Sequence, residues 1–275
     1  MKALLNKITL EHLQRRLEAS TRLLLYVDYD YVLRPQSGGG GEMSLPAADR
    51  DHLRELSEKN GLTLILVSNC SLSRLKKMVG FSGLYLIANN GMEISGPDLN
   101  VVHGEAKRFR QELAPVVEKL QSQLSELPEV ELDDREYSLA VNIYQAKPPV
   151  QRRARMLLEQ AWTPVMDSFT LFENRHELIM RPRLGWGKSR AFLFVWNKFS
   201  SPRRRPFVIY IGTEEGDEEI FSQLGREGMG VVVGSPARAA HSKAGYHLKN
   251  RAEVAKFISW LSTNIARIPT STLAG

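Results

Sequence analysis

The stretch Leu23-Leu24-Leu25-Tyr26-Val27-Asp28-Tyr29-Asp30 decides the fold, because a run of apolar residues ends abruptly in two carboxylates. Apolar residues without alternation are typical of a strand that is buried on both faces, as in the parallel sheet of an α/β protein. Side chains two residues apart on a strand point the same way, so we expect Asp28 and Asp30 to project together from its carboxyl end. Open α/β sheets bind their ligands at that end. Taken alone, the pair is equally compatible with a strand that merely ends in polar residues.

The same arrangement recurs along the chain. Three further apolar strands are predicted, at 62–67, 84–88 and 207–211. The first of them ends in Ser68 and Asn69, and the last is followed by an acidic segment that contains Glu214 and Asp217. Helical patterns separate the strands, at 47–60, 71–79, 189–199, 218–224 and 251–264. This alternation predicts an α/β fold with a Rossmann-like, doubly wound parallel sheet.

Between residues 105 and 182 the pattern changes. Two helical segments there alternate with short strands that look half exposed and antiparallel, at 130–132, 138–144, 168–172 and 177–181. We therefore expect an inserted α+β cap domain of residues 105–182, and a core domain made of residues 1–104 and 183–275. A glycine-rich segment at 34–42 is expected to form a loop close to the two aspartates.

Composition restricts the class of protein. With 43% hydrophobic and 25% charged residues the chain is typical of globular proteins. The single cysteine, Cys70, excludes an intramolecular disulfide and favours a reducing compartment. Residues 1–20 have the pattern of an amphipathic helix and not of a signal peptide, and no apolar run is long enough to span a membrane. We expect a cytoplasmic protein without a membrane partner, and a monomer in preference to an oligomer.

The formal net charge of +6 favours an anionic partner. The basic clusters at 152–155 and 203–205 are not interleaved with the aromatic residues that a single-strand nucleic-acid binder uses for stacking. We interpret them as solvated surface and expect a small anionic molecule, not a nucleic acid, as the partner.

Four polar sites fall at comparable positions in the predicted fold: Asp28 with Asp30, Ser68, Lys188, and the acidic segment at 214–217. Three of them follow apolar strands and Lys188 opens a helix. Together they offer a carboxylate nucleophile, a proton donor, hydrogen-bond donors for phosphate oxygens, and ligands for a cation. These are the groups that phosphoryl transfer to a carboxylate requires.

The segments that carry these residues form recognisable motifs: Asp28-Tyr29-Asp30-Tyr31-Val32, then Ser68, then Trp186-Gly187-Lys188-Ser189-Arg190-Ala191, then Tyr210-Ile211-Gly212-Thr213-Glu214-Glu215-Gly216-Asp217-Glu218-Glu219-Ile220-Phe221. In this order they resemble the haloacid dehalogenase phosphatase superfamily and, within it, the trehalose-6-phosphate phosphatases. The resemblance covers most of the chain, from about residue 23 to residue 261.

The resemblance implies a role for each site residue. Asp28 would attack phosphorus and form an aspartyl-phosphate, and Asp30 would act as general acid and then general base. The other implied roles are phosphate binding by Ser68, Asn69 and Lys188, Mg²⁺ binding by Asp28, Asp30, Glu214 and Asp217, and sugar binding on the cap by Asn142, Tyr144, Glu177 and Arg181. The implied reaction is hydrolysis of a sugar phosphate, trehalose 6-phosphate by default, to the sugar and phosphate.

Departures from the motifs leave a second interpretation open. Tyr31-Val32 stands where the family has Gly-Thr, and a positive φ at Tyr31 would cost about 1–2 kcal/mol. The two adjacent aspartates of the last motif are replaced by Thr213 and Glu214, which is expected to weaken cation binding. The alternative is a catalytically weak or inactive relative that binds a sugar phosphate or a protein partner as a sensor.

Overall fold

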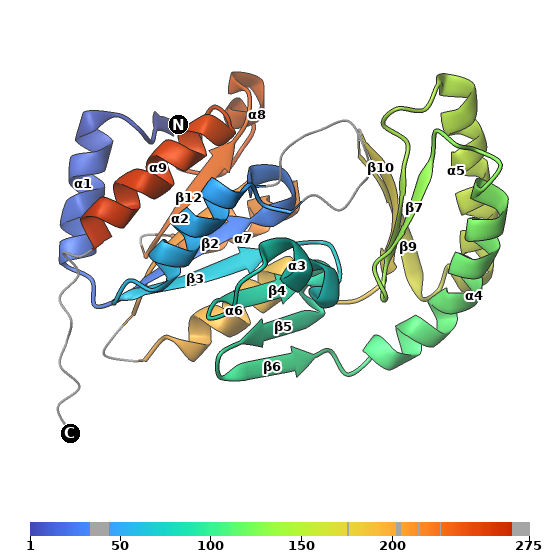
Figure 1. Cartoon of the computed structure of the whole chain (residues 1–275), viewed down its shortest axis with the longest axis horizontal. Coiled ribbons are helices and arrows are strands. Elements are labelled where there is room, and N and C mark those ends of the chain that lie inside the picture. Colours follow the sequence, from blue (N-terminus) through green and yellow to red (C-terminus); the bar gives the residue numbers. More distant parts are fainter. Residues whose placement is uncertain (34–43, 175, 202–204, 214, 226, 266–275) are drawn as a thin grey trace.

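The structure is a computed structural model that describes residues 1–33, 44–174, 176–201, 205–213, 215–225 and 227–265. In it the chain forms two β-sheets, each covered by helices, which lie side by side (Figure 1). We call residues 105–182 the cap and the remainder the core. The glycine-rich segment at 34–42 and Glu214 lie outside the described residues.

Within the described residues the core sheet has nine strands, and its central part is parallel. Their spatial order is β1 (Lys2–Ala3), β13 (Tyr246–Leu248), β12 (Gly228–Val233), β11 (Phe207–Gly212), β2 (Leu23–Asp28), β3 (Leu62–Val67), β4 (Tyr85–Ala88), β5 (Glu93–Gly96) and β6 (Leu99–Val102). All neighbours from β1 to β4 are parallel, whereas β5 and β6 are antiparallel. The predicted α/β fold with a parallel central sheet is confirmed.

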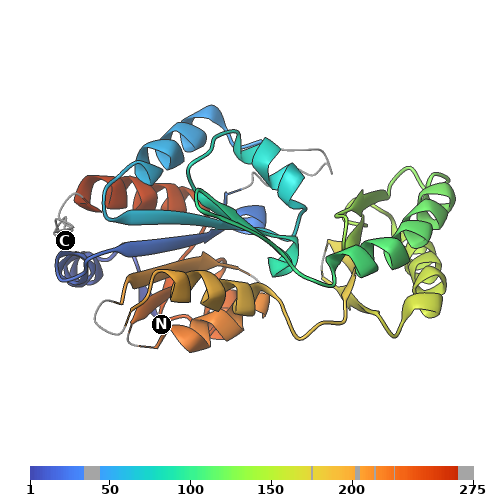
Figure 2. The ribbon, with the colours of Figure 1, turned by 90° about the horizontal axis from the view of Figure 1, so that it is seen from below.

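Helices cover both faces of this sheet (Figure 2). One face packs against α1 (Lys7–Glu18), α2 (Ala47–Ser57), α3 (Leu72–Val79) and α9 (Arg251–Asn264), and the other against α6 (Lys188–Lys198), α7 (Glu218–Leu224) and α8 (Pro236–Ala240). In β2, Leu23, Leu25 and Val27 enter the first hydrophobic cluster, while Leu24 and Tyr26 enter the second. Two buried faces therefore explain why the strand is apolar without alternation.

The central strand β2 lies at the point where the chain changes direction across the sheet. From β2 the chain continues to β3 and β4 on one side, and after the cap it returns as β11 on the other side. The register pairs Asp28 with Val67 of β3, and Val27 with Ile211 of β11. The carboxyl ends of these three strands consequently meet at one edge, which is where α/β sheets bind ligands.

The cap has its own antiparallel sheet, with four strands in the part of the chain that the structure describes. Their order is β7 (Glu131–Asp134), β8 (Leu139–Asn142), β10 (Glu177–Pro182) and β9 (Phe169–Glu173), with helices α4 (Ala106–Leu124) and α5 (Pro148–Trp162). Residues of both helices and of the strands form a third hydrophobic cluster, which Met92 of the core joins and Leu184 of the core packs against. The open face of the cap sheet is turned toward the core (Figure 1).

Several short elements differ from the sequence-based expectations. The first 20 residues contain the predicted helix, but residues 2–3 form a strand that pairs with β13. Strands β5, β6 and β13 and helix α8 were not predicted, since each is only three to five residues long. Four further turns are helical: η1 (Tyr29–Leu33), η2 (Asn89–Gly91), η3 (Thr163–Val165) and η4 (Glu215–Asp217).

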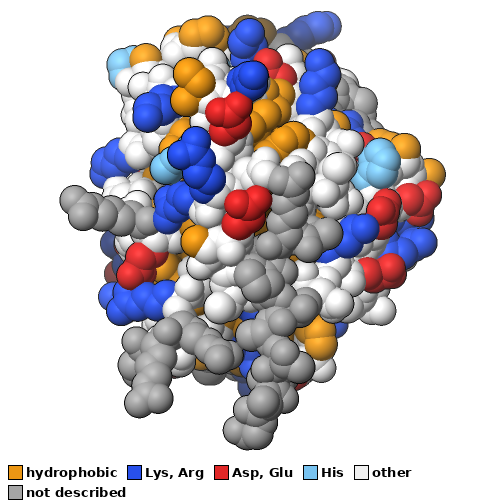
Figure 3. Space-filling view, turned by 90° about the vertical axis from the view of Figure 1, so that its left-hand side faces the viewer, with side chains coloured by type: hydrophobic (Ala, Val, Ile, Leu, Met, Phe, Trp, Pro, Cys, Tyr) orange, Lys and Arg blue, Asp and Glu red, His pale blue; other side chains and the backbone are white. Residues whose placement is uncertain are grey.

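Basic residues on the surface are mixed with acidic ones. On the face formed by α1 and α9, Lys and Arg side chains are scattered among Asp, Glu and hydrophobic side chains (Figure 3). In the two basic clusters, Arg155 pairs with Glu173, and Arg205 pairs with Glu227 at 2.6 Å. No helix in the described part of the chain has both the length and the apolar character needed to cross a membrane.

We predict that Gly91→Ala destabilises the core. Gly91 has φ +94°, and a Cβ atom there would lie 2.7 Å from the carbonyl oxygen of Gly187, next to the start of α6. The left-handed backbone alone costs roughly 1–2 kcal/mol for an L-residue, and the backbone contact adds to this. Urea unfolding should show a lower free energy of unfolding. The matched control is Gly104→Ala, where a Cβ meets nothing within 4 Å; equal unfolding midpoints for the two variants would contradict the prediction.

Candidate active site

Asp28 is the last residue of β2, and its side chain is fully buried at 0% exposure. One carboxylate oxygen, Oδ2, accepts a hydrogen bond from Lys188 Nζ at 2.8 Å. The other, Oδ1, accepts from the backbone N–H of Tyr31 at 3.1 Å. A buried carboxylate needs such partners, because an uncompensated charge in the interior is very costly.

Lys188 is the first residue of α6 and is 4% exposed. A cation at a helix N-terminus is disfavoured by the helix dipole, so this lysine depends on nearby carboxylates. Besides Asp28 it has Asp217, whose Oδ1 lies 3.7 Å from Nζ. The three charges form a buried ion triad that joins β2, α6 and η4.

Asp217 ends the turn η4 and is also fully buried. It accepts hydrogen bonds from the Tyr210 hydroxyl at 2.8 Å and from the backbone N–H of Thr213 at 2.9 Å. A Cβ atom on Gly212 would lie 2.4 Å from Asp217 Oδ2, so glycine at this position makes room for the carboxylate. Burial, with the Asp217 charge as a further cause, raises the pKa of Tyr210 well above its ordinary value, which keeps this phenol a donor.

The expectation that the extended path continues past Asp28 is wrong, so strand alternation does not place Asp30. The strand ends at Asp28 and is followed by the π-helical turn η1. The hydrogen bond from the Tyr31 N–H to the Asp28 carboxylate stabilises this turn. Tyr31 is not among the residues with positive φ, so the strain expected there does not arise. Asp30 instead accepts hydrogen bonds from the Ser68 hydroxyl at 2.9 Å and from the Asn69 N–H at 2.7 Å.

The loop after β3 supplies these donors. Ser68 is fully buried, and its Oγ accepts from the Cys70 N–H at 3.1 Å. Burial, assisted by the Asp30 charge, raises the pKa of Cys70 to about 12. The Cys70 thiol is therefore protonated at neutral pH and is not a candidate nucleophile.

A cleft of 1180 Å³ lies between core and cap, with residues of both along its walls. Its residues from the core are Tyr31, Asn69, Asn90, Lys188, Thr213, Gly216, Val233, Gly234, Arg238, Lys249, Asn250 and Arg251, and those from the cap are Arg135, Ser138, Phe172, Glu173, Asn174, His176, Ile179 and Arg181. Among these residues Lys and Arg far outnumber the single acidic one, Glu173. This charge favours an anionic ligand, and the asparagine and serine side chains suit hydroxyl groups.

The four cap residues predicted to bind the sugar are placed differently from one another. Arg181 lines the cleft and its guanidinium lies 3.3 Å above the centre of the Phe172 ring. Glu177 forms an ion pair with Arg135 at 2.8 Å. Asn142 and Tyr144 are not among the described residues that line the cleft; the Asn142 side chain accepts from the Tyr144 N–H, and the Tyr144 ring contacts His176.

Sequence reasoning missed other cleft residues, Arg135 and Arg238 above all. Burial lowers the pKa of Arg135, but the negative charges of Glu177, Asp133 and Asp30 together raise it by more. The pKa of Arg135 therefore lies above its ordinary value. Arg238 donates to the Thr213 carbonyl oxygen at 2.9 Å and pairs with Glu218 at 2.6 Å. The only signal for Arg135 is its position in the charged segment Asp133-Asp134-Arg135 before a cap strand.

Oxygen ligands for a hard cation are present in part. The Asp28 and Asp217 carboxylates flank Lys188, and the buried Thr213 hydroxyl has no hydrogen-bond partner among the described residues. Carboxylates with a hydroxyl fit Mg²⁺, which uses one or two protein carboxylates together with phosphate and water. Within the described part of the chain, no group of three or more His, Cys, Asp or Glu could hold a metal ion. Asp30 faces Ser68, and Glu214 is not described.

We predict that Lys188→Met lowers the free energy of unfolding by about 3–5 kcal/mol, because it leaves two buried carboxylates without their cation. Chemical denaturation measures the change. The control is Lys198→Met at the other end of α6, where the ion pair with Asp98 is exposed and is worth less than about 1 kcal/mol. Adding Asp28→Asn to Lys188→Met should recover part of the loss; equal losses at positions 188 and 198 would contradict the ion triad.

The family model described as trehalose-phosphatase matches residues 26–252 of the chain. Similar curated proteins include a probable trehalose-phosphate phosphatase 4 of rice (Oryza sativa subsp. japonica), 24% identical over 86% of this chain and 65% of that protein. Another is trehalose 6-phosphate phosphatase RA3 of Zea mays, 23% identical over 88% of this chain and 70% of that protein. The chain thus spans about two thirds of the length of these relatives.

Solved structures show the same fold at low sequence identity. The C-terminal domain of C. albicans trehalose-6-phosphate phosphatase has a TM-score of 0.78 at 17% identity, with 96% of this chain and 99% of that chain covered. A trehalose-6-phosphate phosphatase related protein has a TM-score of 0.74 at 17% identity, with 87% and 97% covered. The C-terminal domain of Candida albicans trehalose synthase regulatory protein has a TM-score of 0.68 at 14% identity, with 92% and 97% covered.

Proposed function

Since the chain belongs to the trehalose-phosphatase family, we propose that it is a sugar-phosphate phosphatase that hydrolyses trehalose 6-phosphate to trehalose and phosphate. The observation that carries the proposal is the buried Asp28 carboxylate, hydrogen-bonded to Lys188 at 2.8 Å and set beneath a cleft with mostly basic charged side chains. A carboxylate in such surroundings stays ionised and can approach an anionic phosphate, because the lysine offsets the repulsion between them.

The reaction proceeds in two steps in this proposal. In the first, an Asp28 oxygen forms a bond to phosphorus while the bond from phosphorus to the sugar oxygen breaks, and Asp30 gives its proton to that oxygen. In the second, Asp30 takes a proton from water, whose oxygen attacks phosphorus and releases phosphate. The cycle begins with Asp28 as a carboxylate and with Asp30 as a carboxylic acid that has taken up a proton, and both end in these states, so it is balanced in protons and charge.

Asp30 must move for this cycle, because its carboxylate now holds the Ser68 hydroxyl and the Asn69 N–H. These two donors are the ones proposed to bind the phosphate oxygens. An arriving phosphate competes for them, since its oxygens accept hydrogen bonds as strongly as a carboxylate does. Substrate binding then releases Asp30 to face the leaving oxygen.

A bound Mg²⁺ would neutralise charge on the phosphate. The residues that would hold it are Asp28 and Asp217, with Thr213 as a neutral oxygen donor where the family motif has a carboxylate. Lys188 contributes a second positive charge from the protein itself. A site with fewer carboxylates binds the cation more weakly, since the attraction falls with ligand charge.

The cleft suits a ligand with both an anionic group and hydroxyl groups. Lys188 and Asn69 line its core wall, and on the cap wall Ser138, Asn174 and His176 offer hydrogen bonds. The ring of Phe172, 38% exposed, adds an apolar surface on the cap side. A sugar ring presents hydroxyl groups at its rim and C–H groups on its face, and therefore matches both kinds of surface.

We predict that Asp28→Asn lowers phosphate release from trehalose 6-phosphate by at least about 1000-fold, because the amide is a far weaker nucleophile. The measurement is inorganic phosphate release with added Mg²⁺, from trehalose 6-phosphate and a panel of other sugar phosphates. Thermal unfolding checks that the variant is folded, and Lys188 keeps Asp217 as its partner. Activity that survives the substitution would overturn the mechanism, and a folded wild-type protein without turnover on any ester would overturn the enzymatic function.

We predict that Thr213→Asp tightens Mg²⁺ binding by about tenfold, because it adds a carboxylate beside Asp217. Titration calorimetry with Mg²⁺ alone measures the affinity independently of turnover. The matched control is Thr213→Asn, which has the same shape without the charge. Equal affinities for the two variants would show that position 213 does not contribute to a cation site.

A second candidate function is a sensor that binds a sugar phosphate without turnover. The similarity in fold to the C-terminal domain of a trehalose synthase regulatory protein favours it, as does Thr213 in place of a motif carboxylate. Calorimetry with trehalose 6-phosphate distinguishes the candidates. Tight binding with no phosphate release supports the sensor, and release abolished by Asp28→Asn supports the phosphatase.

A further inference from the structure

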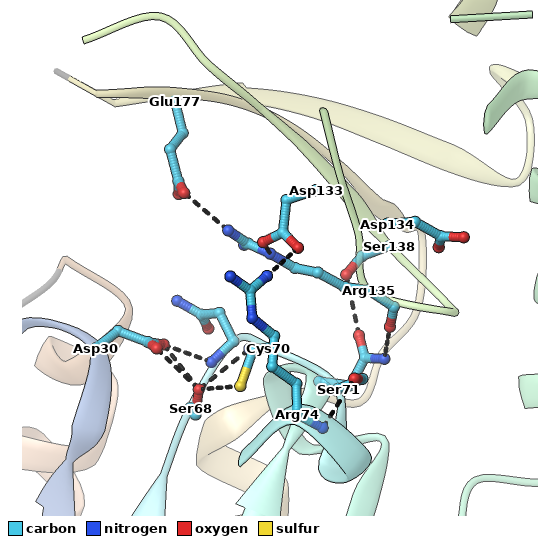
Figure 4. Close-up of polar contacts among 12 residues, drawn as sticks. Asp30, Ser68, Cys70, Ser71, Arg74, Asp133, Asp134, Arg135, Ser138 and Glu177 are labelled. Atoms are coloured by element: carbon cyan, nitrogen blue, oxygen red, sulfur yellow. Dashed lines mark hydrogen bonds and ion pairs between the residues drawn. The ribbon is translucent and has the colours of Figure 1, made fainter. Parts of the chain in front are cut away.

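A network of charged side chains joins the cap to the core beside the reaction centre (Figure 4). Asp133 of the cap strand β7 stands at its middle. Its Oδ2 accepts from Arg135 Nε of the cap at 2.7 Å, and its Oδ1 accepts from Arg74 Nη1 of the core helix α3. One carboxylate therefore bridges an arginine of the core and an arginine of the cap.

The segment between β7 and β8 has a second attachment to the core at Asn89. The Asn89 side chain donates from Nδ2 to the backbone carbonyl oxygen of Arg135, and its Oδ1 accepts from the Ser138 hydroxyl at 2.9 Å. Asn89 itself is 1% exposed and has φ +49°, a left-handed conformation that asparagine tolerates better than most residues. It lies in η2, at the carboxyl end of β4.

Arg135 is fixed by these contacts in a position that faces the reaction centre. It is 7% exposed, lines the cleft, and donates from Nη2 to Glu177 at 2.8 Å. Figure 4 shows its guanidinium and that of Arg74 between the cap sheet and the pair formed by Asp30 and Ser68. Arg74 is not among the described residues that line the cleft, and its contact with the cap is the ion pair with Asp133.

Polar contacts carry much of the attachment between the two domains. Among the described core residues, only Met92 belongs to the hydrophobic cluster of the cap, and Leu184 packs against its edge. Domains joined without a large apolar interface are expected to move relative to each other. A pair of arginine and aspartate, each 19% exposed, is well enough shielded from water to restrict that motion.

We propose that Arg74 is a positioning residue, which holds the cap over the core and, through Asp133, fixes Arg135 on the cap wall of the cleft. The catalytic part of this inference rests on the proposed phosphatase function. Arg74 is the residue to substitute, because Asp133 then keeps Arg135 as its partner. Substituting Arg135 would instead leave Asp133 and Glu177 buried without it, and the variant could fail to fold.

The control for Arg74→Ala is Arg110→Ala. Arg110 of helix α4 pairs with Asp134 at 2.8 Å, so it binds the neighbouring carboxylate on β7 from within the cap. Both variants remove one arginine from one aspartate of the same strand. Only the first removes a contact between cap and core.

The first readout is the distance between the domains, measured by double electron–electron resonance. The spin labels are attached at Ser125→Cys on the cap and at Glu58→Cys on the core, both of which are exposed positions. The native Cys70 is buried with its pKa raised to about 12, so it resists labelling. We expect Arg74→Ala to lengthen and broaden the distance distribution and Arg74→Lys to restore it in part. Arg110→Ala should give the same distance distribution as the parent protein. An unchanged distribution for Arg74→Ala would overturn the inference.

The second readout is kinetic. We expect Arg74→Ala to raise KM for trehalose 6-phosphate about tenfold, and to leave kcat/KM for para-nitrophenyl phosphate unchanged, because that small ester has no sugar for the cap to hold. An equal loss on both esters would overturn the positioning role. If the parent protein hydrolyses neither ester, the proposed function fails, while the distance measurement still decides whether Arg74 holds the cap.

Discussion

The buried ion triad of Asp28, Lys188 and Asp217 is the interaction on which the rest of the structure depends. Each member is at most 4% exposed, and each comes from a different element of the core. None of the three charges is stable there without the others, because burial removes the water that would otherwise solvate it. The carboxyl ends of β2 and β11 and the start of α6 must therefore meet at one edge of the sheet, and the cleft lies above that edge.

The sequence predicted this part of the fold because the signals are local. Strand β3 has the predicted bounds, Leu62–Val67, since a continuous apolar run is followed at once by polar residues. Parallel strands bring their carboxyl ends together, so Asp28, Ser68 and Asp217 could be assigned to one site before the structure was known. The short strands β1 and β13, two and three residues long, carry too few residues for any periodicity, and they form by pairing, β1 with β13 and β13 with β12.

Two features of the site could not be read from the sequence. Alternation along a strand placed Asp30 beside Asp28, but the Asp28 carboxylate accepts from the Tyr31 N–H and the chain turns, which brings Asp30 to Ser68. A hydrogen bond from a nearby backbone N–H to a side chain favours a turn over a continued strand. The periodicity of apolar residues does not indicate which of the two forms. The sequence also gives no signal for the bridge from Arg74 to Asp133, since it joins residues 59 positions apart, one on helix α3 of the core and one on strand β7 of the cap.

The charged residues of the cap act mainly on one another and on the core, and this determines what the cleft offers a ligand. Asp133 and Glu177 are both engaged by Arg135, so their negative charge is offset within the cap. On the floor, Asp28 and Asp217 are offset by Lys188 in the same way. Along the walls of the cleft, Lys and Arg side chains outnumber the single acidic side chain among the described residues, Glu173. The cleft in which a phosphate would bind is therefore lined by more basic than acidic side chains. One of the basic side chains, Arg135, belongs to the cap, so its position depends on the orientation of the cap.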